Sequence, residues 1–185
     1  REIDGIDAVE VQLVEQACIL VKENQDSGTL FLTLSPQAMV ISDFMPTIRS
    51  LFRDYAINPG DMVFEITERD TVKNTRLFEN FVRTLKDEGF RFAIDDFGAG
   101  YSSFQYLKNF PVDYLKVDGE FIRTMGGSST MEREIVSSIA SLASRLKIKT
   151  IAEFVESESI LNEVDNAGID YAQGYHIQRP SPHLA

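Results

Sequence analysis

Residues 62–96 read MVFEITERDTVKNTRLFENFVRTLKDEGFRFAIDD, and this stretch decides the fold class. It opens with a run rich in β-forming residues, Met62 to Ile66, and closes with a second such run, Phe90 to Ile94. Between the two runs, apolar residues recur at the spacing of a helix, at Leu77, Phe81, Val82 and Leu85. A strand, a helix and another strand in succession predict two parallel strands joined by a helical crossover.

The same alternation extends in both directions along the chain. Six strands are expected, at Leu30 to Leu34, Met62 to Ile66, Phe90 to Ile94, Tyr114 to Val117, Lys149 to Ala152 and, more weakly, Tyr171 to Gln173. Helical spacing is found from Val9 to Val21 and from Glu132 to Lys147, and the stretch Gly126 to Thr130 is typical of a loop. A TIM-type (β/α) barrel and an open doubly wound sheet both fit this α/β pattern. Because six strands are fewer than eight and the chain begins at a helix, we expect an N-terminal strand to be missing from this chain.

Length and composition exclude several classes of protein. The 185 residues predict one domain spanning 1–185, and the absence of an initiator methionine before Arg1 indicates an N-terminally truncated fragment. A net charge of −11 argues against binding of polymeric nucleic acid, and no apolar run is long enough to span a bilayer. The single cysteine, Cys18, lies in an apolar run, so we expect a buried side chain and a cytoplasmic domain.

Acids and an amide stand at the end of nearly every expected strand, at Glu65, Asp95, Asp96, Asp118, Glu153 and Gln173. The carboxyl ends of parallel strands share one rim, so these groups are expected to converge there. Clustered carboxylates stay ionised only when cations neutralise them, and oxygen ligands select Mg²⁺, Mn²⁺ or Ca²⁺. The two histidines, His176 and His183, lie in a loop-like tail and are not expected to be ligands.

Lys116 and Asp118 point to the same side of their strand, where the ammonium would meet the carboxylates or a phosphate oxygen. Two divalent ions, several carboxylates and an ammonium suit the attack of an activated water on a phosphodiester. After the third strand, Gly98 and Gly100 allow a tight loop, and Ser102 or Ser103 could cap the next helix.

Five segments resemble the motifs of the EAL domain family of bacterial cyclic di-GMP phosphodiesterases and their degenerate receptor relatives. They are Phe64 to Glu68, Ile94 to Ser103, Leu115 to Asp118, Ala152 to Glu156, and Gln173 to Pro180, in order and at family spacing. The resemblance covers almost the whole chain. It implies an incomplete TIM-type barrel that hydrolyses cyclic di-GMP to linear pGpG with two Mg²⁺ or Mn²⁺ ions.

The resemblance also implies a role for each matched residue. The metal ligands would be Glu65, Asp95, Asp96, Asp118 and Gln173. Glu153 would act as the general base or as a metal-adjacent acid, and Lys116 would orient the attacking water, so both would be catalytic. Glu68 would hold the loop after the third strand, Glu156 would support the site from outside it, and Tyr175 and Pro180 would contact the substrate. Family members commonly form homodimers and sit beside GGDEF or sensor domains, in full-length proteins that can be tethered to a membrane.

Two departures from the family pattern leave alternatives open. The Glu-Ala-Leu that names the family is absent from this chain, and Thr33 stands where the family has a metal-binding Asn. Thr33 is therefore a degenerate position with a poorer ligand. An active phosphodiesterase is the first interpretation, a receptor that binds cyclic di-GMP without turnover the second, and a protein-interaction domain the third. Phe154, where the family usually has Gly, is interpreted as a packing variation.

Overall fold

The computed structural model describes residues 6–23, 28–35, 38, 41, 43–73, 75–98, 107, 110–125 and 130–181. Its strands are β1 (Leu30–Thr33), β2 (Met62–Thr67), β3 (Arg91–Phe97), β4 (Tyr114–Val117), β5 (Lys149–Ala152) and β6 (Tyr171–Ala172). Its helices are α1 (Ile6–Glu23), α3 (Phe44–Tyr55), α4 (Glu68–Lys73), α5 (Thr75–Asp87), α7 (Gly119–Met125), α8 (Thr130–Leu146) and α9 (Glu158–Asn166), with a 3₁₀ turn at Pro59–Asp61.

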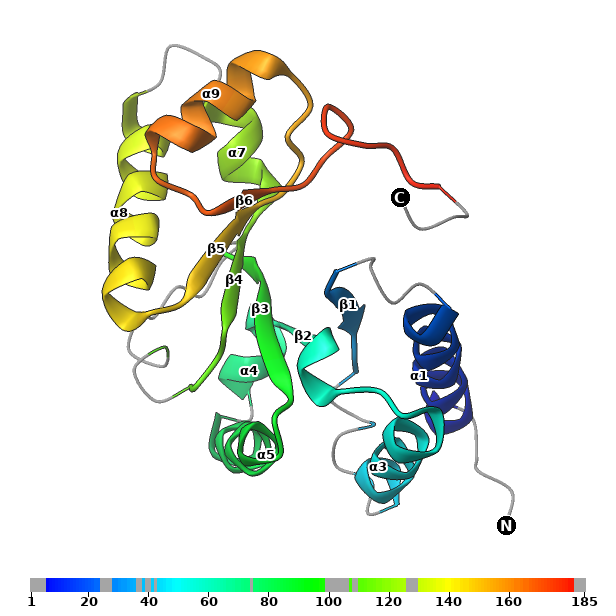
Figure 1. The fold of residues 1–185 in the computed structure, drawn as a ribbon. Coiled ribbons are helices and arrows are strands. Elements are labelled where there is room, and N and C mark those ends of the chain that lie inside the picture. Colours follow the sequence, from blue (N-terminus) through cyan, green and yellow to red (C-terminus); the bar gives the residue numbers. More distant parts are fainter. Residues whose placement is uncertain are drawn as a thin grey trace.

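All described strands join one parallel sheet whose spatial order, β1-β2-β3-β4-β5-β6, is the order of the sequence. A doubly wound sheet reverses its strand order at a switch point, and this sheet does not, so that alternative is excluded. The strands curl into a half-barrel with the helices on its outside (Figure 1). The described residues therefore confirm the predicted TIM-like (β/α) fold, with six strands where a full barrel has eight, and each of the six expected strands is found within a few residues.

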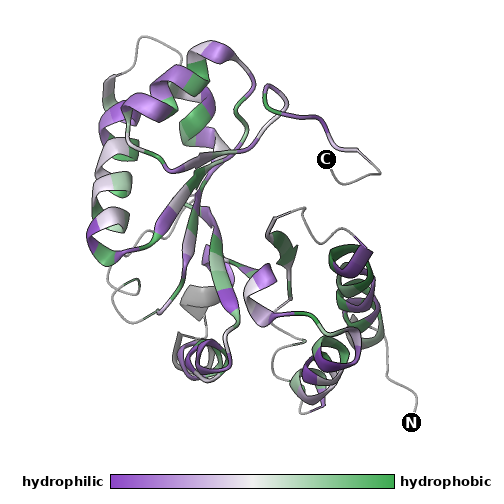
Figure 2. Cartoon of the chain, in the orientation of Figure 1, coloured by the Kyte–Doolittle hydropathy of each residue, from purple (hydrophilic) through white to green (hydrophobic). Residues whose placement is uncertain are grey.

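The core lies between the outer face of the sheet and the helices. Phe64 of β2 and Phe92 of β3 are fully buried there, and the Phe64 ring packs against the rings of Phe92 and Phe90. Phe52 of α3 joins the same aromatic group. Side chains alternate along a strand, so burying these rings outward turns their neighbours inward. Figure 2 shows hydrophilic and hydrophobic residues interspersed along the helices. The packing of this layer fixes which strand residues face the barrel interior.

At the amino ends of the strands, acids have a structural role. Asp113 accepts the backbone N–H of Phe92 at 3.0 Å, and Asp170 accepts the N–H of Thr150 at 2.9 Å. Each carboxylate thus ties the start of one strand to its neighbour. Part of the acid excess therefore stabilises the rim opposite to the expected site.

Several expectations from the sequence need comment. Cys18 is fully buried, as predicted, and burial is the main cause that raises its pKa to about 11. Expected features at Gly100, Ser102, Ser103, 126–129 and His183 lie outside the described residues. No helix in the described part of the chain is long and apolar enough to cross a membrane.

Candidate active site

Lys116 is the centre of a buried cluster of charges inside the half-barrel. Its Nζ lies 2.9 Å from Glu65 Oε1, 2.9 Å from Asp95 Oδ1 and 2.8 Å from Glu153 Oε1. The Lys116 side chain is only 7% exposed. These residues come from β2, β3 and β4 and from the position directly after β5. The predicted convergence of strand-end residues is thus observed, and the ammonium meets the carboxylates as expected.

Thr33 contacts the cluster through Glu65. Strand register places Thr33 directly opposite Glu65, and the Thr33 hydroxyl donates to Glu65 Oε2 at 2.9 Å. Glu65 therefore has one oxygen held by the hydroxyl and the other by Lys116. Here Thr33 orients a carboxylate, the kind of contact through which an outer residue tunes a metal ligand.

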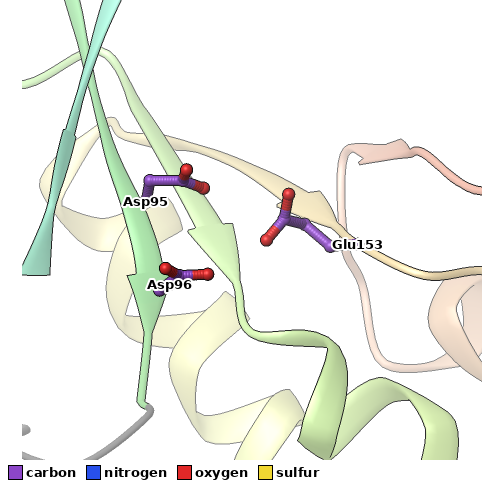
Figure 3. A group of neighbouring side chains, drawn as sticks. All are labelled: Asp95, Asp96 and Glu153. Carbon is purple, nitrogen blue, oxygen red and sulfur yellow. The ribbon is translucent and has the colours of Figure 1, made fainter. Parts of the chain in front are cut away.

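Asp95 and Asp96 both reach the site although they are adjacent in one strand. In a regular strand their side chains would point to opposite faces. The β3–β4 register shifts between Ile94 and Phe97, and Asp96 has a φ of +53°. This irregularity lets one oxygen each of Asp95, Asp96 and Glu153 lie within 4.8 Å of one another (Figure 3). A group of this kind is suited to hold a cation.

Asp118 follows β4 beside this group. Its Oδ1 accepts the backbone N–H of Glu120 at 2.7 Å, which caps the start of α7. Its charge also acts on Asp96. One carboxylate therefore both positions α7 and adds negative charge at the rim.

The carboxylates change each other's acidity. Burial is the largest cause that raises the Glu153 pKa above its ordinary value, and Asp95 and Asp96 add to it against Lys116. Burial also raises the Asp96 pKa, followed by the charges of Asp95 and Asp118. The Lys116 pKa is raised as well: burial opposes the shift, and the three carboxylates outweigh it. The cluster thus favours uptake of positive charge.

A cleft of about 300 Å³ adjoins the cluster. It is lined by Arg123, Glu153, Phe154, Glu156, Gln173, Gly174 and Tyr175. Gly174 fits here because a side chain at this position would collide with the Val155 backbone, at 2.3 Å. The exposed residue Pro180 is not in this lining, so its predicted contact with a substrate stays a prediction.

The sequence identified Glu68 as a site residue but did not identify Arg123. Glu68 is 3% exposed, and its Oε2 accepts the N–H of Gly98 at 2.8 Å, as expected of a residue that holds the loop after β3. Arg123 was not singled out from the sequence. The sequence feature that could have identified Arg123 as a site residue is its position in the helix that begins directly after Asp118, at the rim of the site.

A parallel, TIM-like half-barrel with a carboxylate cluster at the carboxyl ends of its strands defines the class of this protein: α/β-barrel proteins with an acidic site at that rim. The family model described as the EAL domain matches residues 3–180. The chain belongs to the EAL domain family.

Named relatives support this assignment. The chain is 35% identical over 178 residues to cyclic di-GMP phosphodiesterase PdeF of Escherichia coli, covering 95% of this chain and 24% of that protein. It is 43% identical over 119 residues to cyclic di-GMP phosphodiesterase PdeB of Shewanella oneidensis, covering 64% of this chain and 14% of that protein. The chain therefore spans about a quarter or less of the length of these relatives.

Among solved structures, the PaMucR phosphodiesterase in complex with c-di-GMP superposes with a TM-score of 0.88 at 28% identity. The match covers 96% of this chain and 73% of that structure.

Proposed function

We propose that this chain is an EAL-type domain that hydrolyses cyclic di-GMP to linear pGpG with the help of two divalent metal ions. The observation that carries the proposal is the buried Lys116 ammonium, held within 2.9 Å of three carboxylates at the rim of the barrel. The relatives PdeF and PdeB are named as cyclic di-GMP phosphodiesterases, which favours the enzyme over the receptor interpretation.

The residues at the site fit a metal. Five carboxylates, from Glu65, Asp95, Asp96, Asp118 and Glu153, stand against one ammonium, so the fully ionised cluster carries a charge of −4. Two divalent ions would balance that charge. Every donor is an oxygen, which suits Mg²⁺ or Mn²⁺.

We propose Glu65, Asp95, Asp96 and Asp118 as the ligands, with Gln173 at the edge of the cleft. Bound ions would supply charge neutralisation of the phosphate and a lowered pKa for water.

The remaining steps belong to the side chains. Glu153 accepts a proton from the attacking water, and its raised pKa makes it a stronger base than an ordinary carboxylate. Lys116, held by Glu153 and two other carboxylates, orients that water. The water oxygen bonds to phosphorus as the bond between phosphorus and the 3′ oxygen breaks. The 3′ oxygen takes up a proton from solvent, and Glu153 returns its proton to solvent. The product is a linear dinucleotide with a 5′-phosphate and a 3′-hydroxyl.

Product analysis tests this proposal. The purified protein is incubated with cyclic di-GMP and Mn²⁺, and the products are separated by chromatography. We expect linear pGpG with Mn²⁺ and none when a chelator is added. Binding of cyclic di-GMP without any pGpG would overturn the enzyme and leave the receptor. Homodimer formation and a GGDEF or sensor domain in the full-length protein stay predictions.

A further inference from the structure

Phe154 has an unusual backbone conformation at the edge of the site. Its φ is +54°, in the left-handed region that bulky side chains rarely adopt. It follows Glu153 directly, and its side chain is not buried: the residue is 46% exposed. A strained residue with a half-exposed ring beside an active site is a reason to look for a function of the ring.

The Phe154 ring packs against α7. Arg123 Cζ lies 4.1 Å from the ring centroid, in cation–π contact. The ring also packs onto Gly119, where an added Cβ would lie only 2.1 Å from Phe154 Cδ2. Gly119 and Arg123 are four residues apart in the helix and lie on the same side of it. Two contacts from one helix therefore hold the ring in place.

The rest of the ring opens into the cleft of about 300 Å³ that adjoins the carboxylate cluster. Arg123 is the one basic residue among the described residues lining that cleft, whose other charged members are Glu153 and Glu156. The cleft thus offers a flat apolar surface and one cation next to the proposed phosphodiester site. Such a cleft suits a purine nucleotide, because the base can stack on the flat surface and the cation attracts the anionic phosphate.

We propose that Phe154 is a stacking platform for one purine base of the bound dinucleotide, with Arg123 fixing the ring from α7. This inference rests on the proposed function and adds a determinant of affinity to it. The stacking contact between base and ring does not depend on the geometry of the reacting phosphate. We therefore expect Phe154 to affect the affinity for the dinucleotide and to leave the rate of the chemical step unchanged.

The test compares four forms of the protein: wild type, Phe154→Leu, Phe154→Gly and Phe154→Tyr. Affinity for cyclic di-GMP is measured by calorimetry in chelator, and kcat and KM are measured with Mn²⁺. We expect Leu and Gly to weaken binding and raise KM by about 5- to 150-fold, and Tyr to stay within about threefold of wild type. The kcat of each variant stays within about twofold of wild type.

A matched control is Lys147→Gly. Lys147 has a φ of +62°, is exposed, and precedes β5, at the end of that strand opposite to Phe154. This change relieves the same kind of backbone strain without touching the cleft, so Kd and KM stay unchanged. If Phe154→Leu binds as tightly as wild type while its melting temperature falls, the ring only packs the protein and the inference is wrong. If wild type itself neither binds nor hydrolyses cyclic di-GMP, the proposed function fails instead.

Discussion

Replacing Lys116 by Met tests the charge balance of the cluster. The substitution keeps most of the side-chain volume but removes a buried ammonium that contacts Glu65, Asp95 and Glu153 at 2.8–2.9 Å. Removing one partner of a buried ion pair costs about 3–5 kcal/mol, because the other charge stays buried without its partner. Three carboxylates lose their partner here, so we expect a loss near the upper end, about 5 kcal/mol.

The effect is measured by thermal unfolding in metal-free buffer at neutral pH. At about 2–4 °C per kcal/mol for a chain of this size, the melting temperature of Lys116→Met falls by about 10–20 °C. The folded-state pKa of Lys116 lies above its unfolded value, against the effect of burial and because of its three carboxylate partners. The stabilisation is therefore complete below the ordinary lysine pKa and is lost only as pH rises through the folded value. Neutral buffer measures the whole effect.

Two comparisons make the result specific. Lys149→Met removes a surface ammonium paired with Asp170, whose exposed setting predicts a much smaller change. Adding Mn²⁺ to Lys116→Met should recover part of the lost stability, because divalent ions replace the missing positive charge. A melting temperature within about 2 °C of wild type would refute the reasoning, since the carboxylates would then not depend on the ammonium.

Three further predictions concern Thr33, Glu68 and the binding of Mn²⁺. Thr33→Val removes the hydroxyl bonded to Glu65 and should raise the Mn²⁺ concentration for half-maximal activity about tenfold, whereas Thr33→Asn should not raise it. Equal Mn²⁺ concentrations for Thr33→Val and wild type would contradict this prediction. Glu68→Ala leaves the Gly98 N–H without its acceptor and should lower the free energy of unfolding by about 1–3 kcal/mol in a denaturant titration. An unchanged free energy of unfolding would show that the contact does not stabilise the protein. Saturation of wild type with Mn²⁺ at about 100 times its Kd should add about 2.7 kcal/mol of stability, and no shift would show that no ion binds.

Much of the fold was predictable because the strands can be recognised from their local amino-acid composition. Buried β-rich runs such as Met62–Thr67 need no distant contact to be recognised, and helical spacing identifies α5 and α8. α3 was not predicted. Its sequence contains Pro46, which is tolerated only near a helix start, so the local signal favours a break. The periodicity left barrel and open sheet as alternatives, because strand order depends on contacts between distant residues, and the family resemblance predicted the barrel.

The site was predictable in its members and not in its geometry. Acids at strand ends identified the cluster, since parallel strands share a rim. The joint approach of Asp95 and Asp96 depends on a register shift and a φ of +53°, which local sequence does not reveal. In the same way, Phe154 was interpreted as a packing variation. Its left-handed backbone and its contact with Arg123 become visible only in three dimensions.

Glu153→Gln gives the most direct test of the account. Amide and carboxylate have nearly the same shape, but only the carboxylate accepts a proton, so the variant should bind cyclic di-GMP within about threefold of wild type while kcat falls about 10²- to 10⁴-fold. The measurement is pGpG formation at saturating Mn²⁺ and cyclic di-GMP, beside the binding constant of the same preparation. Loss of turnover with binding preserved is the predicted result. Turnover of Glu153→Gln at the wild-type rate would contradict the assignment of this cluster as the hydrolytic site.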